Sequence, residues 1–178
     1  HLDIYAVQNS HAPAPVVGRF DGGLSQLLRG DGRGHFAAVP PAESGLIVPG
    51  DGRAVGTLDF DHDGRPDFVV TRNNSTTLAF HNKGVAGRNA LRVCLTGGPG
   101  NPTAVGARIT ADYNDGSTET GEVSAGAGYY SQSSAAVFFG YSDANPIQRI
   151  RVRWPSGAST TRDLPAQSTT LTVAAPKP

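Results

Sequence analysis

The sequence predicts an all-β protein with two parts: short strands joined by Asp/Gly loops, followed by an antiparallel sandwich or barrel. Three observations support this. The 178 residues include 23 glycines and 13 prolines, spread too evenly for long helices. Apolar and β-branched residues occur in short runs bounded by turn residues. An aspartate-rich loop, "DFDHDGRPD" at residues 59–67, leads directly into one such run.

The first part extends to about residue 86. Residues 24–39 predict a hairpin with its turn at Gly30–Gly34, and residues 54–82 predict strand, Asp loop, strand, turn and strand. "HLDIYAV" at the start of the chain aligns with "RPDFVVT" at residues 65–71, which matches Asp3 with Asp67. This alignment indicates an internal repeat.

The second part begins near residue 89. Apolar and polar residues alternate there in several short stretches, a spacing typical of an antiparallel sandwich or barrel. In "IQRIRVRW" at residues 147–154, the period of two places Trp154 in the core. The same period places three arginines on one outer face: Arg149, Arg151 and Arg153.

Composition excludes several classes of protein. Lys+Arg and Asp+Glu are both 15, so the basic surplus of nucleic-acid-binding proteins is missing. No apolar run approaches the roughly 20 residues that span a bilayer. Cys94 is the single cysteine, and its apolar context predicts a buried, inert thiol. The chain contains no methionine, so we expect a processed product or part of a longer protein.

The Asp loop has the spacing of a calcium loop. The carboxylates of Asp59, Asp61, Asp63 and Asp67 occupy its first, third, fifth and ninth places, and the backbone carbonyl of Arg65 occupies the seventh. Glycine at the sixth place allows the sharp turn that such loops need. The twelfth place is a valine and the flanks are strands, which excludes an EF-hand. We therefore expect calcium as the cofactor, with magnesium the lesser candidate and a solvated Asx turn the alternative.

Two resemblances cover most of the chain. "DFDHDGRPDFVV" at residues 59–70 resembles the calcium loop of FG-GAP/VCBS repeats, the blades of integrin-type propellers. The second half resembles the ASPIC/UnbV domain of cartilage acidic protein and its bacterial relatives. The matching stretches are "NPTAVGARI" (101–109), "GAGYYSQSS" (126–134), "FFGYS" (138–142) and "RVRWPSG" (151–157). "FFGYS" departs from the usual Phe-Gly-Leu-Gly of that family.

These resemblances imply partial β-propeller-like blades at residues 1–86 and an antiparallel β-sandwich at residues 87–178. They imply an extracellular or cell-surface protein that binds calcium and is not an enzyme. Neither a Gly-x-Ser-x-Gly elbow nor a His-Glu-x-x-His motif occurs in the sequence. The expected function is a calcium-stabilised interaction or structural module with a protein partner.

Two alternatives from other classes remain open. The strand "LDIYAV" looks like part of a blade whose earlier carboxylates are missing, which leaves an open strand edge. Either more blades precede it in a longer parent, which we favour, or another copy completes the edge and builds a filament. The other alternative is a glycan-binding domain or an accessory domain of a hydrolase.

Two further features are candidate sites. Asn73 and Asn74 begin overlapping N-glycosylation sequons in a predicted surface turn. The arginines 149, 151 and 153 suit an anionic glycan or the carboxylates of a partner. A solvated outer strand face is the alternative, favoured by the zero net charge and the absence of an aromatic row.

Overall fold

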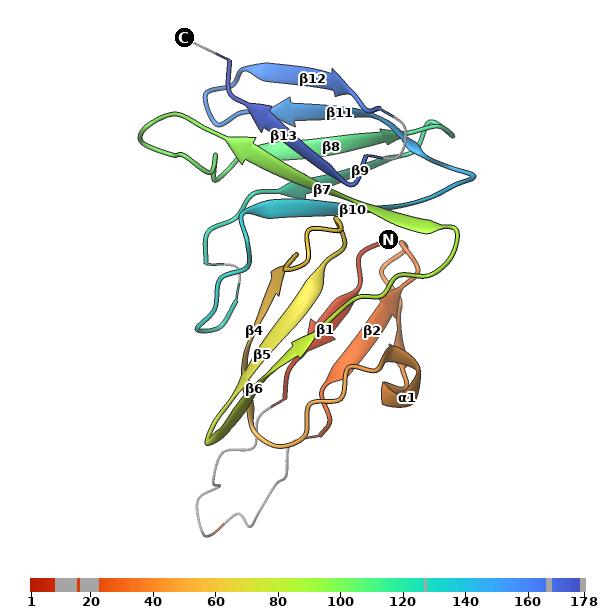
Figure 1. Ribbon diagram of the computed structural model, residues 1–178, viewed down its shortest axis with the longest axis vertical. Helices are drawn as coiled ribbons and strands as arrows, with labels where there is room; N and C mark the ends of the chain where they lie inside the picture. Colours follow the sequence, from red (N-terminus) through yellow and green to blue (C-terminus); the bar gives the residue numbers. More distant parts are fainter. Residues whose placement is uncertain (9–15, 17–22, 127, 166–167, 177–178) are drawn as a thin grey trace. The chain divides into compact units, whose positions relative to one another are not determined.

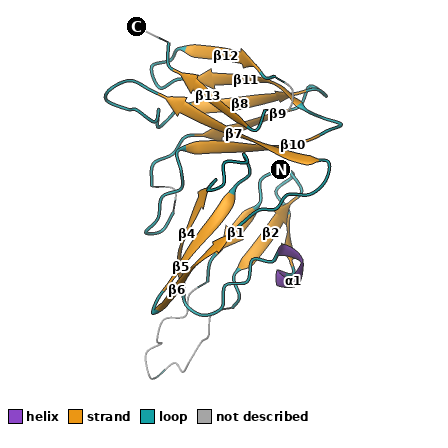
Figure 2. Ribbon diagram, viewed as in Figure 1, coloured by secondary structure: helices purple, strands orange, loops and turns teal. Residues whose placement is uncertain are grey.

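The structure, a computed structural model, describes residues 1–8, 16, 23–126, 128–165 and 168–176. Their regular structure consists of strands β1 to β13 and a four-residue helix, α1 (Pro41–Ser44), so the predicted all-β class is confirmed (Figures 1 and 2). None of the helical structure in these residues is long and apolar enough to cross a membrane.

Contacts divide the chain into two compact units that are not contiguous in sequence. The first contains residues 1–56, 68–80 and 128–131, and the second contains residues 57–67, 81–127 and 132–178. The Asp loop therefore groups with the second unit.

The first unit is built on two three-stranded sheets. One contains β1 (Ile4–Ala6), β2 (Gln26–Gly30) and β3 (Phe36–Val39) in the order β1-β2-β3. The other contains β4 (Gly52–Leu58), β5 (Asp67–Arg72) and β6 (Ser75–Phe80) in the order β4-β5-β6, and the ends of β4 and β5 count with the second unit. A complete propeller blade has four strands. The propeller-like blades therefore stay a prediction.

The internal repeat has a structural counterpart. Strands β1 and β2 pair through Ile4 and Leu28, and Asp3, one residue before Ile4, accepts a hydrogen bond from the N–H of Gly30 at 2.9 Å. Strands β5 and β6 pair through Phe68 and Phe80, and Asp67, one residue before Phe68, accepts one from the N–H of Asn82 at 2.8 Å. In both hairpins the donor lies two residues beyond the partner strand's pairing residue. The aligned aspartates thus have the same structural role.

The second unit contains two sheets that share one core. Strands β7 (Arg88–Thr96), β10 (Ala136–Ser142) and β13 (Thr170–Ala174) form a sheet in the order β10-β7-β13. Strands β8 (Arg108–Tyr113), β9 (Thr118–Glu122), β11 (Ile147–Arg153) and β12 (Ser159–Asp163) form the other, in the order β12-β11-β8-β9. All pairs with an assigned register in this unit are antiparallel except β13 with β7, which is parallel. An apolar alternation pattern carries no information on the direction of the partner strand, so the sequence could not predict this parallel pair.

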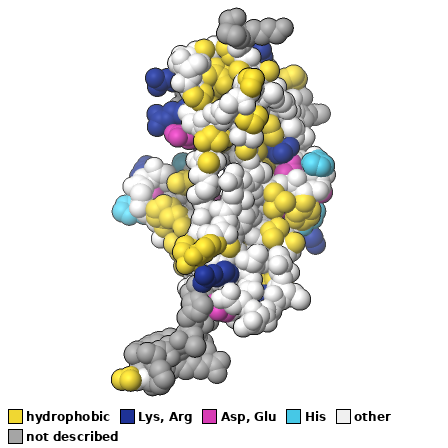
Figure 3. All heavy atoms as spheres, turned by 90° about the vertical axis from the view of Figure 1, so that its left-hand side faces the viewer, with side chains coloured by type: hydrophobic (Ala, Val, Ile, Leu, Met, Phe, Trp, Pro, Cys, Tyr) yellow, Lys and Arg dark blue, Asp and Glu magenta, His cyan; other side chains and the backbone are white. Residues whose placement is uncertain are grey.

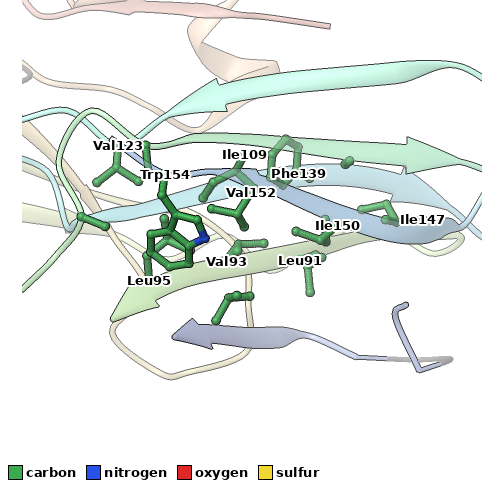
Figure 4. Packing of buried hydrophobic residues seen from close by; sticks show 14 residues of the cluster. Leu91, Val93, Leu95, Ile109, Val123, Phe139, Ile147, Ile150, Val152 and Trp154 are labelled. Carbon is green, nitrogen blue, oxygen red and sulfur yellow. The ribbon is translucent and has the colours of Figure 1, made fainter. Parts of the chain in front are cut away.

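The core of this unit is formed by alternate residues of the facing strands. Buried side chains from β7, β8, β10 and β11 converge on one space in Figure 4: Leu91, Val93, Leu95, Ile109, Phe139, Ile147, Ile150 and Val152. Trp154 joins them at 4% exposure and donates its indole N–H to Thr160 Oγ1 at 2.8 Å. Its predicted burial is confirmed.

The prediction for Cys94 was wrong. On β7 the core side chains are those of Val93 and Leu95, and Cys94, which lies between them, is half-buried on the opposite face. In "LRVCLT" the polar residues Arg92 and Thr96 share the face of Cys94, so the alternation of this strand places the thiol away from the core.

Candidate metal site

The loop between β4 and β5 is shaped by two residues with positive φ. Gly64 has φ +88° and is buried, and a Cβ added to it would overlap the backbone oxygen of Thr169. Only glycine fits there without displacing the neighbouring chain. His62 has φ +63° and is exposed, so its side chain projects from the loop.

Two of the loop carboxylates are buried and accept hydrogen bonds from backbone N–H groups. The side chain of Asp59 has no exposed surface and accepts from Asp63 at 3.1 Å and Gly64 at 3.2 Å. Asp67 is fully buried and accepts from Phe60 at 3.2 Å and Asn82 at 2.8 Å. Charged carboxylates are rarely buried without compensation, and these hydrogen bonds supply part of it.

The carboxylate of Asp61 lies close to these two. One oxygen each of Asp59, Asp61 and Asp67 lie within 4.8 Å of one another. Calcium holds oxygen ligands at about 2.3–2.6 Å, so two ligands of one ion lie at most about 5 Å apart. The three carboxylates therefore fit a single calcium ion in both chemistry and spacing. The remaining places would be filled by water or backbone oxygens.

Of the other two predicted ligands, Asp63 is placed differently, and the backbone carbonyl of Arg65 stays a prediction. Asp63 belongs to a second group, with Asp61 and His81, whose ligand atoms also lie within 4.8 Å of one another. The guanidinium of Arg65 contacts the Asp63 carboxylate through Nη2, and its Nε donates to the backbone oxygen of Asn82 at 2.8 Å. The structure thus separates Asp63 from the all-oxygen group.

His81 is a residue that the sequence analysis missed. Its Nε2 lies 2.8 Å from Asp61 Oδ2 and 3.9 Å from Asp63 Oδ2, and its ring is 5.7 Å from that of Phe60. The available signal was hairpin register. With a turn at residues 73–74 and Phe68 opposite Phe80, the next residue of the returning strand is brought beside the Asp loop.

A basic side chain on β7, that of Arg92, offsets part of the negative charge of the Asp loop. Arg92 Nε lies 3.9 Å from Asp59 Oδ2, and within the described residues this buried nitrogen has no hydrogen-bond partner. A single guanidinium at this distance compensates only part of the charge of three converging carboxylates. The loop therefore retains an excess of negative charge that a cation would neutralise.

The candidate glycosylation sites lie in the turn between β5 and β6. Asn73 donates its side-chain Nδ2 to Asp51 Oδ2 at 2.9 Å and its backbone N–H to Asp51 O at 2.9 Å. Asn74 is exposed at φ +51°. The atom to which a glycan is attached is Nδ2, so Asn74 is the more accessible of the two acceptors.

The three arginines lie on the outer face of β11, as the period of two predicted. Arg149 Nε lies 3.0 Å from Asp163, and Arg151 binds Asp112 through Nε and Nη2 at 2.9 and 2.7 Å. This hydrogen-bonded pairing raises the pKa of Arg151 above its usual value. Of the described residues, none forms an ion pair or hydrogen bond with the side chain of Arg153. In Figure 3, basic and acidic side chains are few and interspersed with uncharged atoms, as the balanced composition leads one to expect.

Comparison with known proteins identifies one domain. Residues 97–178 match the ASPIC and UnbV family, so an ASPIC/UnbV domain is found in this part of the chain. The predicted resemblance to that family is confirmed there, and the FG-GAP/VCBS resemblance of the first part stays a prediction. No curated protein matched the chain.

Proposed function

We propose that this protein is a calcium-stabilised, non-enzymatic interaction module of the extracellular space or cell surface. In this proposal residues 59–67 form an FG-GAP/VCBS-type calcium loop, and the two-sheet second unit is a β-sandwich that presents binding surfaces. The observation that carries the proposal is the convergence of Asp59, Asp61 and Asp67, two of them buried. Without a cation their mutual repulsion lowers the free energy of unfolding.

Calcium is favoured over other divalent ions by the donor set. The first group offers only carboxylate oxygens, which hard cations prefer, and its loop geometry is irregular, which calcium tolerates better than magnesium. The second group includes the imidazole of His81, which suits zinc and other transition metals. The two groups share Asp61, so they cannot both be filled independently.

Thermal unfolding tests the proposal. Extracellular calcium sites have dissociation constants of about 10⁻⁴–10⁻³ M, so 1 mM calcium should stabilise the wild-type protein over EDTA by about 0.5–1.5 kcal/mol. For a chain of this size that is a rise of roughly 1–6 °C in midpoint. Magnesium should raise the midpoint less.

Two variants separate the overlapping groups. Asp61→Asn should abolish the calcium effect, while His81→Gln should preserve it, because His81 belongs only to the mixed group. An unchanged midpoint in calcium would refute the proposal. A midpoint raised by zinc but not by calcium, and lost in His81→Gln, would assign the site to a transition metal instead.

A filament remains the second candidate, because β1 is an edge strand with exposed apolar residues. Ile4 is 40% exposed and Leu2, two residues before the strand, is 77% exposed; among the described residues β1 lies at the edge of its sheet, next to β2. Such an edge is a template for strand addition by another copy. The C-terminal strand β13 already pairs with β7 in the chain, which weakens it as the donor. Light scattering on residues 1–178 tests this candidate, since a stable monomer would exclude self-assembly.

A further inference from the structure

The outer face of the sheet β12-β11-β8-β9 carries two polar rows across its strands. Strand pairing aligns the first row as Ser159, Arg153, Arg108 and Glu122. It aligns the second row as Thr161, Arg151, Thr110 and Thr120. Residues paired across strands project from the same face, so the side chains of both rows point away from the core.

A hollow of about 360 Å³ lies over these rows. Three arginines line it, Arg108, Arg151 and Arg153. Hydroxyl groups flank them, from Thr110, Thr120, Ser159 and Thr161. Within the described residues no carboxylate lines the hollow itself, but Glu122 and Asp112 pair with Arg108 and Arg151 beside it, so Arg153 supplies its excess positive charge.

The three arginines differ in how far their charges are already compensated. Arg151 is held by the bidentate contact with Asp112, which fixes its guanidinium in place. Arg108 Nε lies 3.3 Å from Glu122, and both side chains are more than half exposed. Such an exposed pair contributes little, so a ligand anion can replace Glu122 at low cost. Arg153 has no partner of its own in the described part of the chain.

The spacing of these groups suits a ligand with repeated anionic groups. Arg151 and Arg153 are two residues apart on one strand, a separation of about 6.6–6.8 Å along it. Arg108 lies opposite Arg153 on the neighbouring strand, about 4.7–4.9 Å away between backbones. A guanidinium binds carboxylate or sulfate oxygens through two parallel hydrogen bonds.

The other lining groups narrow the class of ligand. Val152 is the one apolar residue among the described residues that line the hollow, and its side chain is buried in the core. Over the described part of the chain, the hollow therefore has no aromatic ring on which a neutral sugar could stack and no apolar pocket for a peptide side chain. The hydroxyl groups both donate and accept hydrogen bonds. They match a ligand that carries hydroxyl and anionic groups together. An acidic peptide offers mainly acceptors on its side chains.

We propose that this hollow, formed by Arg108, Arg151, Arg153 and the neighbouring hydroxyl groups, binds an anionic polysaccharide. Carboxylate and sulfate groups share the chemistry that the arginines recognise. None of the residues that line the hollow belongs to the Asp loop, so this proposal does not depend on the proposed calcium function.

Three polymers of one backbone test the proposal on the full chain. Fluorescently labelled dextran sulfate, carboxymethyl dextran and neutral dextran of equal length are titrated with protein in 1 mM calcium and low salt, and anisotropy is measured. At least one anionic dextran should bind, and neutral dextran should not. The anionic dextran that binds more tightly shows whether the hollow prefers sulfate or carboxylate groups. Binding should weaken as NaCl rises from 50 to 200 mM. Equal binding of neutral dextran, or no binding of either anionic polymer, would overturn the proposal.

Arginine substitutions locate the site. Arg108→Gln with Arg153→Gln should weaken binding by roughly 2- to 30-fold. Arg162→Gln removes the same kind of charge from an exposed residue of β12 outside the hollow and should leave binding unchanged. Arg153→Glu, which reverses the charge at one position of the hollow, is a second test variant and should also weaken binding. Circular dichroism checks that each variant is folded. Labelled poly-glutamate, titrated in the same way, represents an acidic peptide. Equal losses in Arg162→Gln, or tighter binding of poly-glutamate than of both anionic dextrans, would overturn the proposal.

Discussion

Asp67 should stabilise the fold even when no cation is bound, and this separates a structural role from a metal-binding one. The substitution Asp67→Asn keeps the size of the side chain and one acceptor oxygen. Its new amide donor must face the N–H of either Phe60 or Asn82, each of which now donates to a carboxylate oxygen. One hydrogen bond is therefore lost, and a backbone donor is left without a partner.

The size of the effect follows from the burial of the group. Asp67 is fully buried, so solvent does not take over the lost hydrogen bond. An unsatisfied buried donor costs about 1–3 kcal/mol. Relief of repulsion from Asp59 and Asp61 offsets a part of this cost. We expect Asp67→Asn to lower the free energy of unfolding in EDTA by about 1–3 kcal/mol.

Asp61→Asn is the matched control, with the same substitution and charge change in the same loop. The Asp61 carboxylate is partly exposed, and its one backbone hydrogen bond is long, 3.4 Å from the N–H of Asp63. In EDTA this variant should be as stable as the wild type or slightly more stable. Urea unfolding followed by the fluorescence of Trp154 reports on the unit that contains the loop. Equal losses in both variants would refute the assignment of Asp67 as a structural residue.

Two further perturbations test other parts of the second unit. Gly64→Ala should lower the free energy of unfolding in urea by about 1–3 kcal/mol more than Gly116→Ala does. Both glycines have positive φ, but of the two only Gly64 abuts a backbone atom, the Thr169 oxygen. Equal losses would contradict that contact. Burial and the hydrogen bond to Glu119 raise the pKa of Tyr113, so its contribution to stability is fully present below about pH 10 and is lost at higher pH. Tyr113→Phe should therefore show a smaller fall in unfolding midpoint above pH 10, and an unchanged fall would exclude this cause.

Much of the second unit could be predicted from the sequence. Strong alternation in "IRVRW" fixed both the burial of Val152 and Trp154 and the exposure of the arginines between them. Period-two patterning is reliable where apolar and polar residues alternate strictly. At Cys94 the prediction failed because it rested on the apolar neighbours of the thiol and not on the period, which places Cys94 on the face of Arg92 and Thr96.

The sequence by itself determined the all-β class, the ASPIC/UnbV resemblance and the position and carboxylate spacing of the acidic loop. Glycine spacing, strand-length apolar runs and carboxylate spacing are local properties of the chain. Tertiary structure alone decided which groups meet. It grouped Asp63 with Asp61 and His81 instead of with Asp59 and Asp67, and it paired β13 in parallel with β7. It also placed Arg108 opposite Arg153, 45 positions later in the chain, to form the positive hollow. These contacts depend on strand order and register, which are set by the packing of the whole core and are not encoded in any short stretch.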